Sequence, residues 1–195
     1  MSGIKRLTGS EPFHSDGAHT KATLLDFWRW ADSDLRSNAT RGRLAEFVVA
    51  MDLNAAEGVR REWVSFDLTH PNGVSVEVKS AAYVQGWKQR RPSVISFGIA
   101  PTRAWDPDTA EFAPPPPRRQ AKVYVFALLG EKDASKLDPL DLSQWQFFVL
   151  STSILNARTP KQKQITLGAL RKLEPIEVSF GGISAAVVNE AKRAA

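Results

Sequence analysis

Four charged side chains in the first half of the chain have the types and spacing that metal-assisted hydrolysis requires. They are Glu46, Asp67, Glu77 and Lys79. Paired carboxylates bind hard divalent cations such as Mg²⁺, with Mn²⁺ as a substitute, and the metal polarises a phosphate and acidifies a bound water. A neighbouring ammonium orients that water or stabilises developing charge. We therefore expect a Mg²⁺ site suited to phosphodiester hydrolysis.

Residues 63–79 predict a β-hairpin that brings three of these side chains together. The loop Pro71-Asn72-Gly73 has the residue types of a three-residue hairpin turn. It places Asp67 directly opposite Glu77, with Cβ atoms about 5 Å apart. Like charges in that position destabilise a sheet, so the pair needs a cation, either a bound metal or the Lys79 ammonium. The apolar face of the hairpin is formed by Val64, Phe66, Leu68, Val74, Val76 and Val78.

A helix expected over residues 40–53 is apolar nearly all round, which predicts that it is buried. Glu46 interrupts its apolar surface. A carboxylate in such surroundings must be paired, protonated or bound to a metal, because leaving it bare costs several kcal/mol. Glu46 therefore either joins the metal site or pairs with Arg43 or Arg60.

The order Asp67, nine intervening residues and then Glu77-Val78-Lys79 resembles the motif of the PD-(D/E)XK nuclease superfamily. Phe66 stands in place of the proline of that motif, which contributes no ligand. The resemblance covers residues 40–100 and implies a Mg²⁺-dependent nuclease acting on DNA rather than RNA. In it, Lys79 would position the nucleophile, and the metal ligands would be Asp67, Glu77, Glu46 and the backbone carbonyl of Val78.

The segment after Lys79 mixes aromatic, amide and basic side chains, which suits a nucleic-acid surface beside the metal. Basic side chains neutralise phosphates and aromatic rings stack on splayed bases, both largely without regard to sequence. Tyr83 and Trp87 lie four residues apart, so a buried helical stripe is the alternative for these two. The residues expected to bind nucleic acid are Tyr83, Gln85, Trp87, Lys88, Arg90 and Arg91.

The composition limits the class of protein. The chain has 195 residues, of which 43% are hydrophobic and 24% charged, as expected for a globular domain that folds without disulfide bonds or structural metal ions. A net charge of +5 is compatible with DNA as a partner. Cysteine is absent, which excludes thiolate metal ligands. Without a signal-peptide core or an apolar run near the roughly 20 residues of a membrane span, we expect a cytoplasmic protein with no membrane partner.

We expect a flexible N-terminal arm over residues 1–20 and a single nuclease-like α/β domain over residues 21–195. A Pro-rich loop at 106–120 cannot join a sheet. Apolar periodicity predicts helices over 23–36, with its aromatic face in the core, over 40–53 and over 182–193, and strands over 93–99, 122–129 and 145–150. The continuous apolar run at 122–129 is typical of a central strand covered on both faces.

These elements indicate an α/β fold with a mixed central sheet of about five strands flanked by helices, which the resemblance implies is restriction-endonuclease-like. Two alternatives to a nuclease stay open. The first is a catalytically inactive domain of the same fold that binds nucleic acid or another protein. The second is a hairpin whose polar face is merely solvated. The oligomeric state also stays open, a homodimer included.

Overall fold

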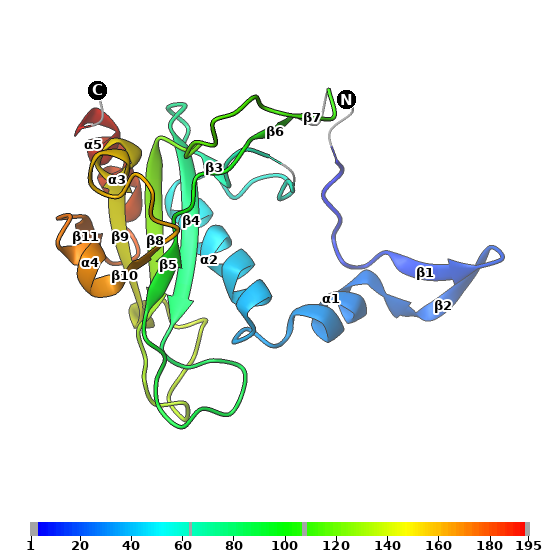
Figure 1. The fold of residues 1–195 in the computed structure, drawn as a ribbon. Coiled ribbons are helices and arrows are strands. Elements are labelled where there is room, and N and C mark those ends of the chain that lie inside the picture. The colour runs from blue at the N-terminus through cyan, green and yellow to red at the C-terminus, as the bar shows by residue number, and fades with distance from the viewer. Residues whose placement is uncertain (1–3, 63, 107–108, 194–195) are drawn as a thin grey trace.

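The computed structural model describes residues 4–62, 64–106 and 109–193. Its centre is a mixed sheet of five strands in the order β11-β9-β8-β4-β3, in which β4 and β8 are parallel and the other pairs antiparallel (Figure 1). The predicted α/β class and mixed central sheet are confirmed. The strands are β3 (Leu68–Thr69), β4 (Ser75–Ala82), β8 (Val123–Leu129), β9 (Trp145–Ser151) and β11 (Ile176–Val178).

Strand β8 is buried along its whole length, as its continuous apolar sequence predicted. One face of the sheet packs against the helices α2 (Asn38–Asp52) and α5 (Ile183–Arg193). The other face is covered by the helices α3 (Thr152–Arg158) and α4 (Leu167–Arg171) and by a two-stranded ribbon of β5 (Ser96–Gly98) and β10 (Gln164–Thr166). A 3₁₀ turn, η1 (Leu142–Gln144), leads into β9.

Two strands differ from the sequence prediction. The strand expected over 93–99 was predicted to extend the main sheet, but β5 pairs with β10 instead, and the fifth place is taken by β11 on the free edge of β9. The first arm of the predicted hairpin is short, because only Leu68–Thr69 joins the ladder and Val64 is 43% exposed. Trp63 lies outside the described residues.

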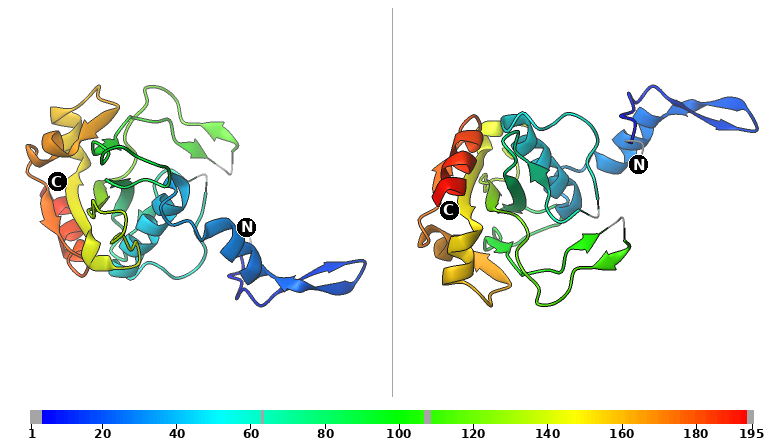
Figure 2. Two further views of the ribbon diagram at one scale, coloured as in Figure 1. Left: turned by 90° about the horizontal axis from the view of Figure 1, so that it is seen from below. Right: turned by 90° about the horizontal axis from the view of Figure 1, so that it is seen from above.

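The N-terminal arm carries regular structure that the sequence did not predict. Strands β1 (Pro12–Ser15) and β2 (Ala18–Thr23) form a hairpin, and α1 (Leu24–Asp32) follows directly. The aromatic face of α1 was predicted to be core, and that prediction is wrong: no residue of α1 is buried, and Trp30 is 84% exposed. The arm extends away from the sheet, as Figure 2 shows from two directions. The apolar face of α1 is therefore not covered by the central sheet, although its sequence is amphipathic.

The Pro-rich segment does not join the main sheet, as predicted, but it contains a small ladder of its own. Strands β6 (Trp105–Asp106) and β7 (Glu111–Phe112) pair with each other, while residues 107–108 lie outside the described part of the chain. Among the described helices, none is both long and apolar enough to span a bilayer.

Candidate active site

The register of the hairpin is the one that the turn predicted. Leu68 lies opposite Val76 and Thr69 opposite Ser75, so the same spacing brings Asp67 to the level of Glu77. The Asp67 Oδ2 atom accepts a hydrogen bond of 2.8 Å from the backbone N–H of Val78. Asp67 is thereby held against β4 although it precedes the two-residue strand β3.

Three carboxylates act on one another around this point. Burial, followed by the negative charges of Glu77 and Glu46, raises the pKa of Asp67 to about 6, although the Val78 N–H and the Lys79 ammonium lower it. Near neutral pH a fraction of Asp67 therefore remains protonated. A carboxyl kept partly neutral by neighbouring acids is what a site short of one cation produces.

Glu77 has an internal cation. The Lys79 Nζ atom lies 2.5 Å from Glu77 Oε1, and the two side chains are only 33% and 18% exposed. Of the two compensating cations that the sequence left open, the ammonium is the one that the structure shows. The phenol of Tyr124, opposite Glu77 on β8, also belongs to these surroundings, because burial and then the charge of Glu77 raise its pKa.

Glu46 is held by Arg60, the pairing that the sequence left open as an alternative to metal binding. The Nε and Nη2 atoms of Arg60 lie 2.5 and 3.0 Å from the two carboxylate oxygens, and Arg60 Nη1 lies 3.3 Å from Glu62. The hydrogen bonds to Glu46 raise the pKa of Arg60. Glu46 is thus close enough to influence Asp67 but is engaged in a bidentate pair.

Glu46 and Asp67 open into a cleft of about 610 Å³ that we call the carboxylate cleft. Its rim is basic, with guanidinium groups from four positions, and its walls are partly apolar through exposed Phe47 and Val59. Such a rim suits a polyanion, because guanidinium groups bind phosphates bidentately. The four arginines are Arg6, Arg43, Arg60 and Arg61.

The donor atoms around Asp67 suit a hard divalent cation in part. Asp67, from the loop before β3, and Glu77, from β4, supply carboxylate oxygens, which is the chemistry that Mg²⁺ prefers. Over the described residues, no group of three or more acidic or histidine side chains is arranged to hold a metal ion. The donor set is thus limited to the pair Asp67 and Glu77, and Glu46 would first have to leave Arg60.

The residues expected to bind nucleic acid are not beside the carboxylates. Gln85, Trp87, Lys88, Arg90 and Arg91 line a second cleft after the end of β4, and its lining shares no residue with the carboxylate cleft. Tyr83 lies under the ammonium of Lys132, which is 4.7 Å from the ring centre. The helical-stripe alternative for Tyr83 and Trp87 is wrong, because residues 83–92 form no helix.

The sequence did not assign two site residues to their present roles. Arg60 was one of two possible partners for Glu46, and nothing in the sequence distinguished it from Arg43. Tyr124 lies within the apolar run of β8, so the sequence pattern predicted a core residue at this position. The signal for Tyr124 is positional, since a phenol in a buried strand needs a polar neighbour, and β4 supplies Glu77.

Comparison with known families gives one match. The model of the family described as Bacteriophage T4 endonuclease IV matches residues 15–167, which is most of the chain and includes both clefts except for Arg6. No curated protein and no solved structure matches the chain significantly.

Proposed function

We propose, from the premise that the chain belongs to the bacteriophage T4 endonuclease IV family, that it is a Mg²⁺-dependent endonuclease that hydrolyses phosphodiester bonds in DNA. Because that family is described as an endonuclease, the chain belongs to a nuclease family. The metal dependence, the DNA substrate and a PD-(D/E)XK type of site are our inference. The observation that carries them is the pair Asp67 and Glu77, in which Asp67 is held against β4 by the N–H of Val78 and has its pKa raised to about 6 by burial and by the charge of Glu77.

Asp67 and Glu77 would hold the Mg²⁺, with the backbone carbonyl of Val78 as a third oxygen. The hydrogen bond from Val78 N–H to Asp67 Oδ2 fixes one carboxylate oxygen and leaves the other free to bind. When bound, the metal polarises the phosphate and supplies an acidified water. Mn²⁺ also accepts this set of oxygen ligands.

Lys79 has a role that depends on Glu77. Its Nζ atom lies 2.5 Å from Glu77 Oε1. With Glu77 serving as a metal ligand, Nζ would be able to donate to the attacking water or to a phosphate oxygen. Lys79 thus acts as a positioning and charge-stabilising group, which is worth about 10²- to 10³-fold in rate.

The basic rim of the carboxylate cleft binds the substrate. Arg43, Arg60 and Arg61 line it together with Arg6, and contacts of this kind hold the phosphate backbone without reading its sequence. Arg60 has two states in this proposal. It neutralises Glu46 in the free protein, and it becomes available to a phosphate when Glu46 turns to the metal.

A second candidate function is a domain of the same fold that binds nucleic acid without cleaving it. The observation that favours it is that Glu46 and Glu77 each already have an internal cation, Arg60 and Lys79. Such pairs would persist if no metal ever displaced them. The two candidates differ in one measurement, which is cleavage.

The test is cleavage of plasmid and oligonucleotide DNA, and of RNA, by the full chain in EDTA and in millimolar Mg²⁺ or Mn²⁺. The proposal expects metal-dependent cleavage that Glu77→Gln and Asp67→Asn abolish. Glu174→Gln, which removes a carboxylate outside both clefts, is the matched control and should cleave as the parent does. Binding without cleavage under every metal would establish the second candidate instead.

A further inference from the structure

The cleft after the end of β4 is built from three separate stretches of the chain. Residues 84–92 form most of it, Arg36 comes from the turn before α2, and Lys132 with Ala134 comes from the loop after β8. Its volume is about 520 Å³, enough for a nucleotide-sized group. Every charged side chain in its described lining is basic: Arg36, Lys88, Arg90, Arg91 and Lys132. We call it the basic cleft.

Next to the wall of the basic cleft lies a buried arginine that pairs with no carboxylate among the described residues. Arg41 is only 5% exposed, and burial lowers its pKa. Its Nη1 atom donates to the carbonyl of Arg36 and to Gln85 Oε1, each at 3.2 Å, and its Nη2 atom donates to Asn38 Oδ1 at 2.8 Å. All three acceptors are neutral, and the Nε atom has no partner.

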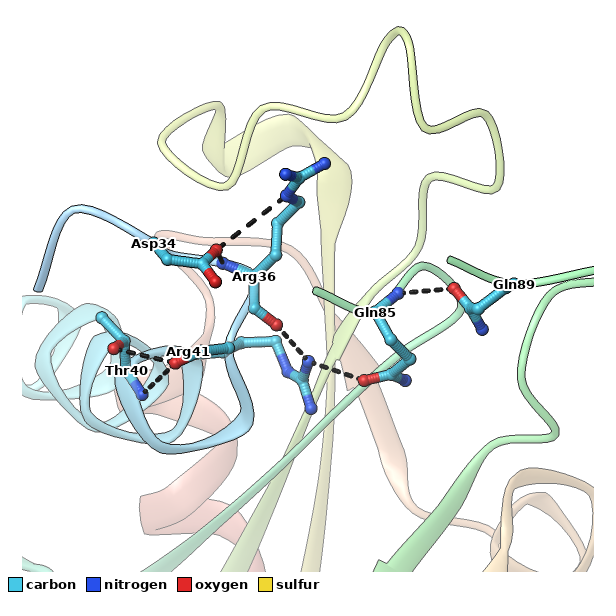
Figure 3. A network of polar contacts seen from close by, with 7 residues as sticks. Asp34, Arg36, Thr40, Arg41, Gln85 and Gln89 are labelled. Atoms are coloured by element: carbon cyan, nitrogen blue, oxygen red, sulfur yellow. Dashed lines mark hydrogen bonds and ion pairs between the residues drawn. The ribbon is translucent and has the colours of Figure 1, made fainter. Parts of the chain in front are cut away.

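Figure 3 shows the Arg41 guanidinium directed at Gln85 and at the carbonyl of Arg36. Both of those residues line the basic cleft, so the buried charge is in direct contact with two residues of the cleft wall. A buried cation normally lies beside an anion, because desolvating an unpaired charge costs several kcal/mol. An anion bound in the cleft would supply the counter-charge that Arg41 lacks among its hydrogen-bond partners.

The loop that carries Gln85 is held in place by side-chain amides. Gln85 Nε2 donates to the carbonyl of Ala82 at 2.8 Å, and Gln89 Oε1 accepts from the N–H of Gln85 at 2.7 Å. Gln89 Nε2 lies 2.9 Å from Ser93 Oγ. At Gly86 the loop approaches the segment before α2 so closely that a Cβ would lie 3.3 Å from Asp34 Oδ2. The basic cleft is thus preformed rather than assembled on binding.

The surroundings supply little opposing charge. The first turn of α2, which begins beside Arg36, contains no acidic residue and is capped by the neutral hydroxyl of Ser37. On this side of the cleft Asp34 accepts a hydrogen bond of 3.1 Å from the N–H of Arg36 and lies 4.0 Å from its Nε. On the other side Glu131 and Asp133 flank Lys132, but no carboxylate belongs to the described lining, which carries five basic side chains.

We propose that the basic cleft binds a phosphate group, at a site separate from the carboxylate cleft, and that Arg41 acts through Gln85 and Arg36 to favour the bound anion. The phosphate belongs to the backbone of a nucleic acid or to a small phosphorylated ligand. Exposed Trp87, at 59%, stands at the cleft and can stack on a base. For the nucleic-acid source the inference rests on the proposed function, and the cleft then anchors substrate at a distance from the scissile bond.

The distance is set by β4 itself. Lys79 and Gln85 are six residues apart in sequence, which is at most about 20 Å of extended chain. A phosphate in the basic cleft and one at Lys79 would therefore belong to the same short stretch of a strand. Short oligonucleotides that fill only the carboxylate cleft should be cleaved without help from the basic cleft.

The experiment measures binding in EDTA, where no cleavage occurs, with two probes: a fluorescent 20-nucleotide DNA and inorganic phosphate. The test variants are Lys132→Ala and Lys88→Ala combined with Arg90→Ala. The matched control is Lys136→Ala, which removes the same charge from the loop of Lys132 but lies outside the lining. Heat denaturation of each variant establishes that it is folded.

We expect the slope of log Kd against log [salt] for DNA to fall by about one for Lys132→Ala and about two for the double variant, since each lost phosphate contact removes 0.7 to 0.9. Lys136→Ala should keep the parent slope. Inorganic phosphate that raises the melting temperature of the parent but of neither test variant would show that a free phosphate suffices. Phosphate without effect, together with the changed DNA slopes, assigns the cleft to nucleic acid.

Unchanged slopes and no response to phosphate in folded variants would overturn this proposal. That outcome is distinct from failure of the proposed function. If Mg²⁺-dependent cleavage is absent but the slopes change, the basic cleft stands and the nuclease proposal fails. If cleavage is present, the slopes are unchanged and phosphate has no effect, the nuclease proposal stands and the basic-cleft proposal fails.

Discussion

Asp67 Oδ2 accepts a 2.8 Å hydrogen bond from the N–H of Val78, the residue between Glu77 and Lys79. This bond connects the loop before β3 to the strand that carries the other two charged groups. It keeps Asp67 close to Glu77 at a cost, because the two charges repel. The Lys79 ammonium pairs with Glu77 and offsets part of this repulsion.

The first prediction concerns metal affinity. Calorimetric titration with Mg²⁺ or Mn²⁺ should show binding in the millimolar range, because the ligands are a few hard oxygens and two of the three nearby acids have internal cations. Glu77→Ala should remove that binding. If Glu77→Ala binds metal as tightly as the parent, the site has been assigned to the wrong residues.

The second prediction separates Lys79 from the metal ligands. Lys79→Ala should lower metal-dependent cleavage by about 10²-fold or more while metal stays bound, because an ammonium acts on water and phosphate rather than on the cation. Metal should even bind slightly better, since Glu77 loses its internal partner. Equal cleavage rates for Lys79→Ala and the parent at saturating metal would remove Lys79 from the mechanism.

The third prediction uses Arg60. Arg60→Ala frees Glu46 from its bidentate pair, so the dissociation constant for Mg²⁺ should fall several-fold while that for DNA rises. Arg60→Lys keeps the charge but loses the bidentate geometry. Its dissociation constants for Mg²⁺ and for DNA should lie between those of the parent and those of Arg60→Ala. Arg103→Ala, an exposed arginine outside both clefts, is the control. Metal affinity that does not respond to either change at Arg60 would mean that Glu46 has no access to the cation.

The sequence predicted the parts of this fold that depend on local chemistry. The turn residues 71–73 carry their own conformational preferences, and the register that follows from them is the one observed. The apolar run of β8 predicted a strand covered on both faces, and every residue of β8 is buried. These signals are local, because turn type and burial of a strand are determined by neighbouring residues in the chain.

What the sequence did not predict depends on contacts across the chain. Strand β11 has three residues and no clear pattern of its own, and it exists because β9 offers an edge. The amphipathic period of α1 is real, but a period does not say whether anything covers the apolar face. Arg41 looked like an ordinary residue of α2 in sequence. Its lack of a carboxylate partner follows from the position of Gln85, 44 residues away.

The last prediction tests the central pair through stability. In the folded protein the pKa of Asp67 is about 6, above the 3.8 of an ordinary aspartate. The folded state therefore binds this proton more tightly than the unfolded state. The contribution of Asp67 to stability is fully present below about pH 4 and is lost as pH rises through 6. The loss is limited to about 2 to 3 kcal/mol.

Asp67→Asn keeps an oxygen that can accept from Val78 N–H but has no charge to repel. In EDTA at pH 8 this variant should be more stable than the parent by about 1 to 3 kcal/mol, and the difference should vanish near pH 4. With 10 mM Mg²⁺ and a dissociation constant near 1 mM, the parent should gain about 1.4 kcal/mol and the variant little. Melting curves of both proteins across pH, with EDTA and with Mg²⁺, supply the measurement, and Glu174→Gln controls for the loss of one negative charge. If Asp67→Asn melts well below the parent in EDTA at pH 8 and Mg²⁺ stabilises neither protein, Asp67 is a structural hydrogen-bonding residue and the nuclease proposal loses its main support.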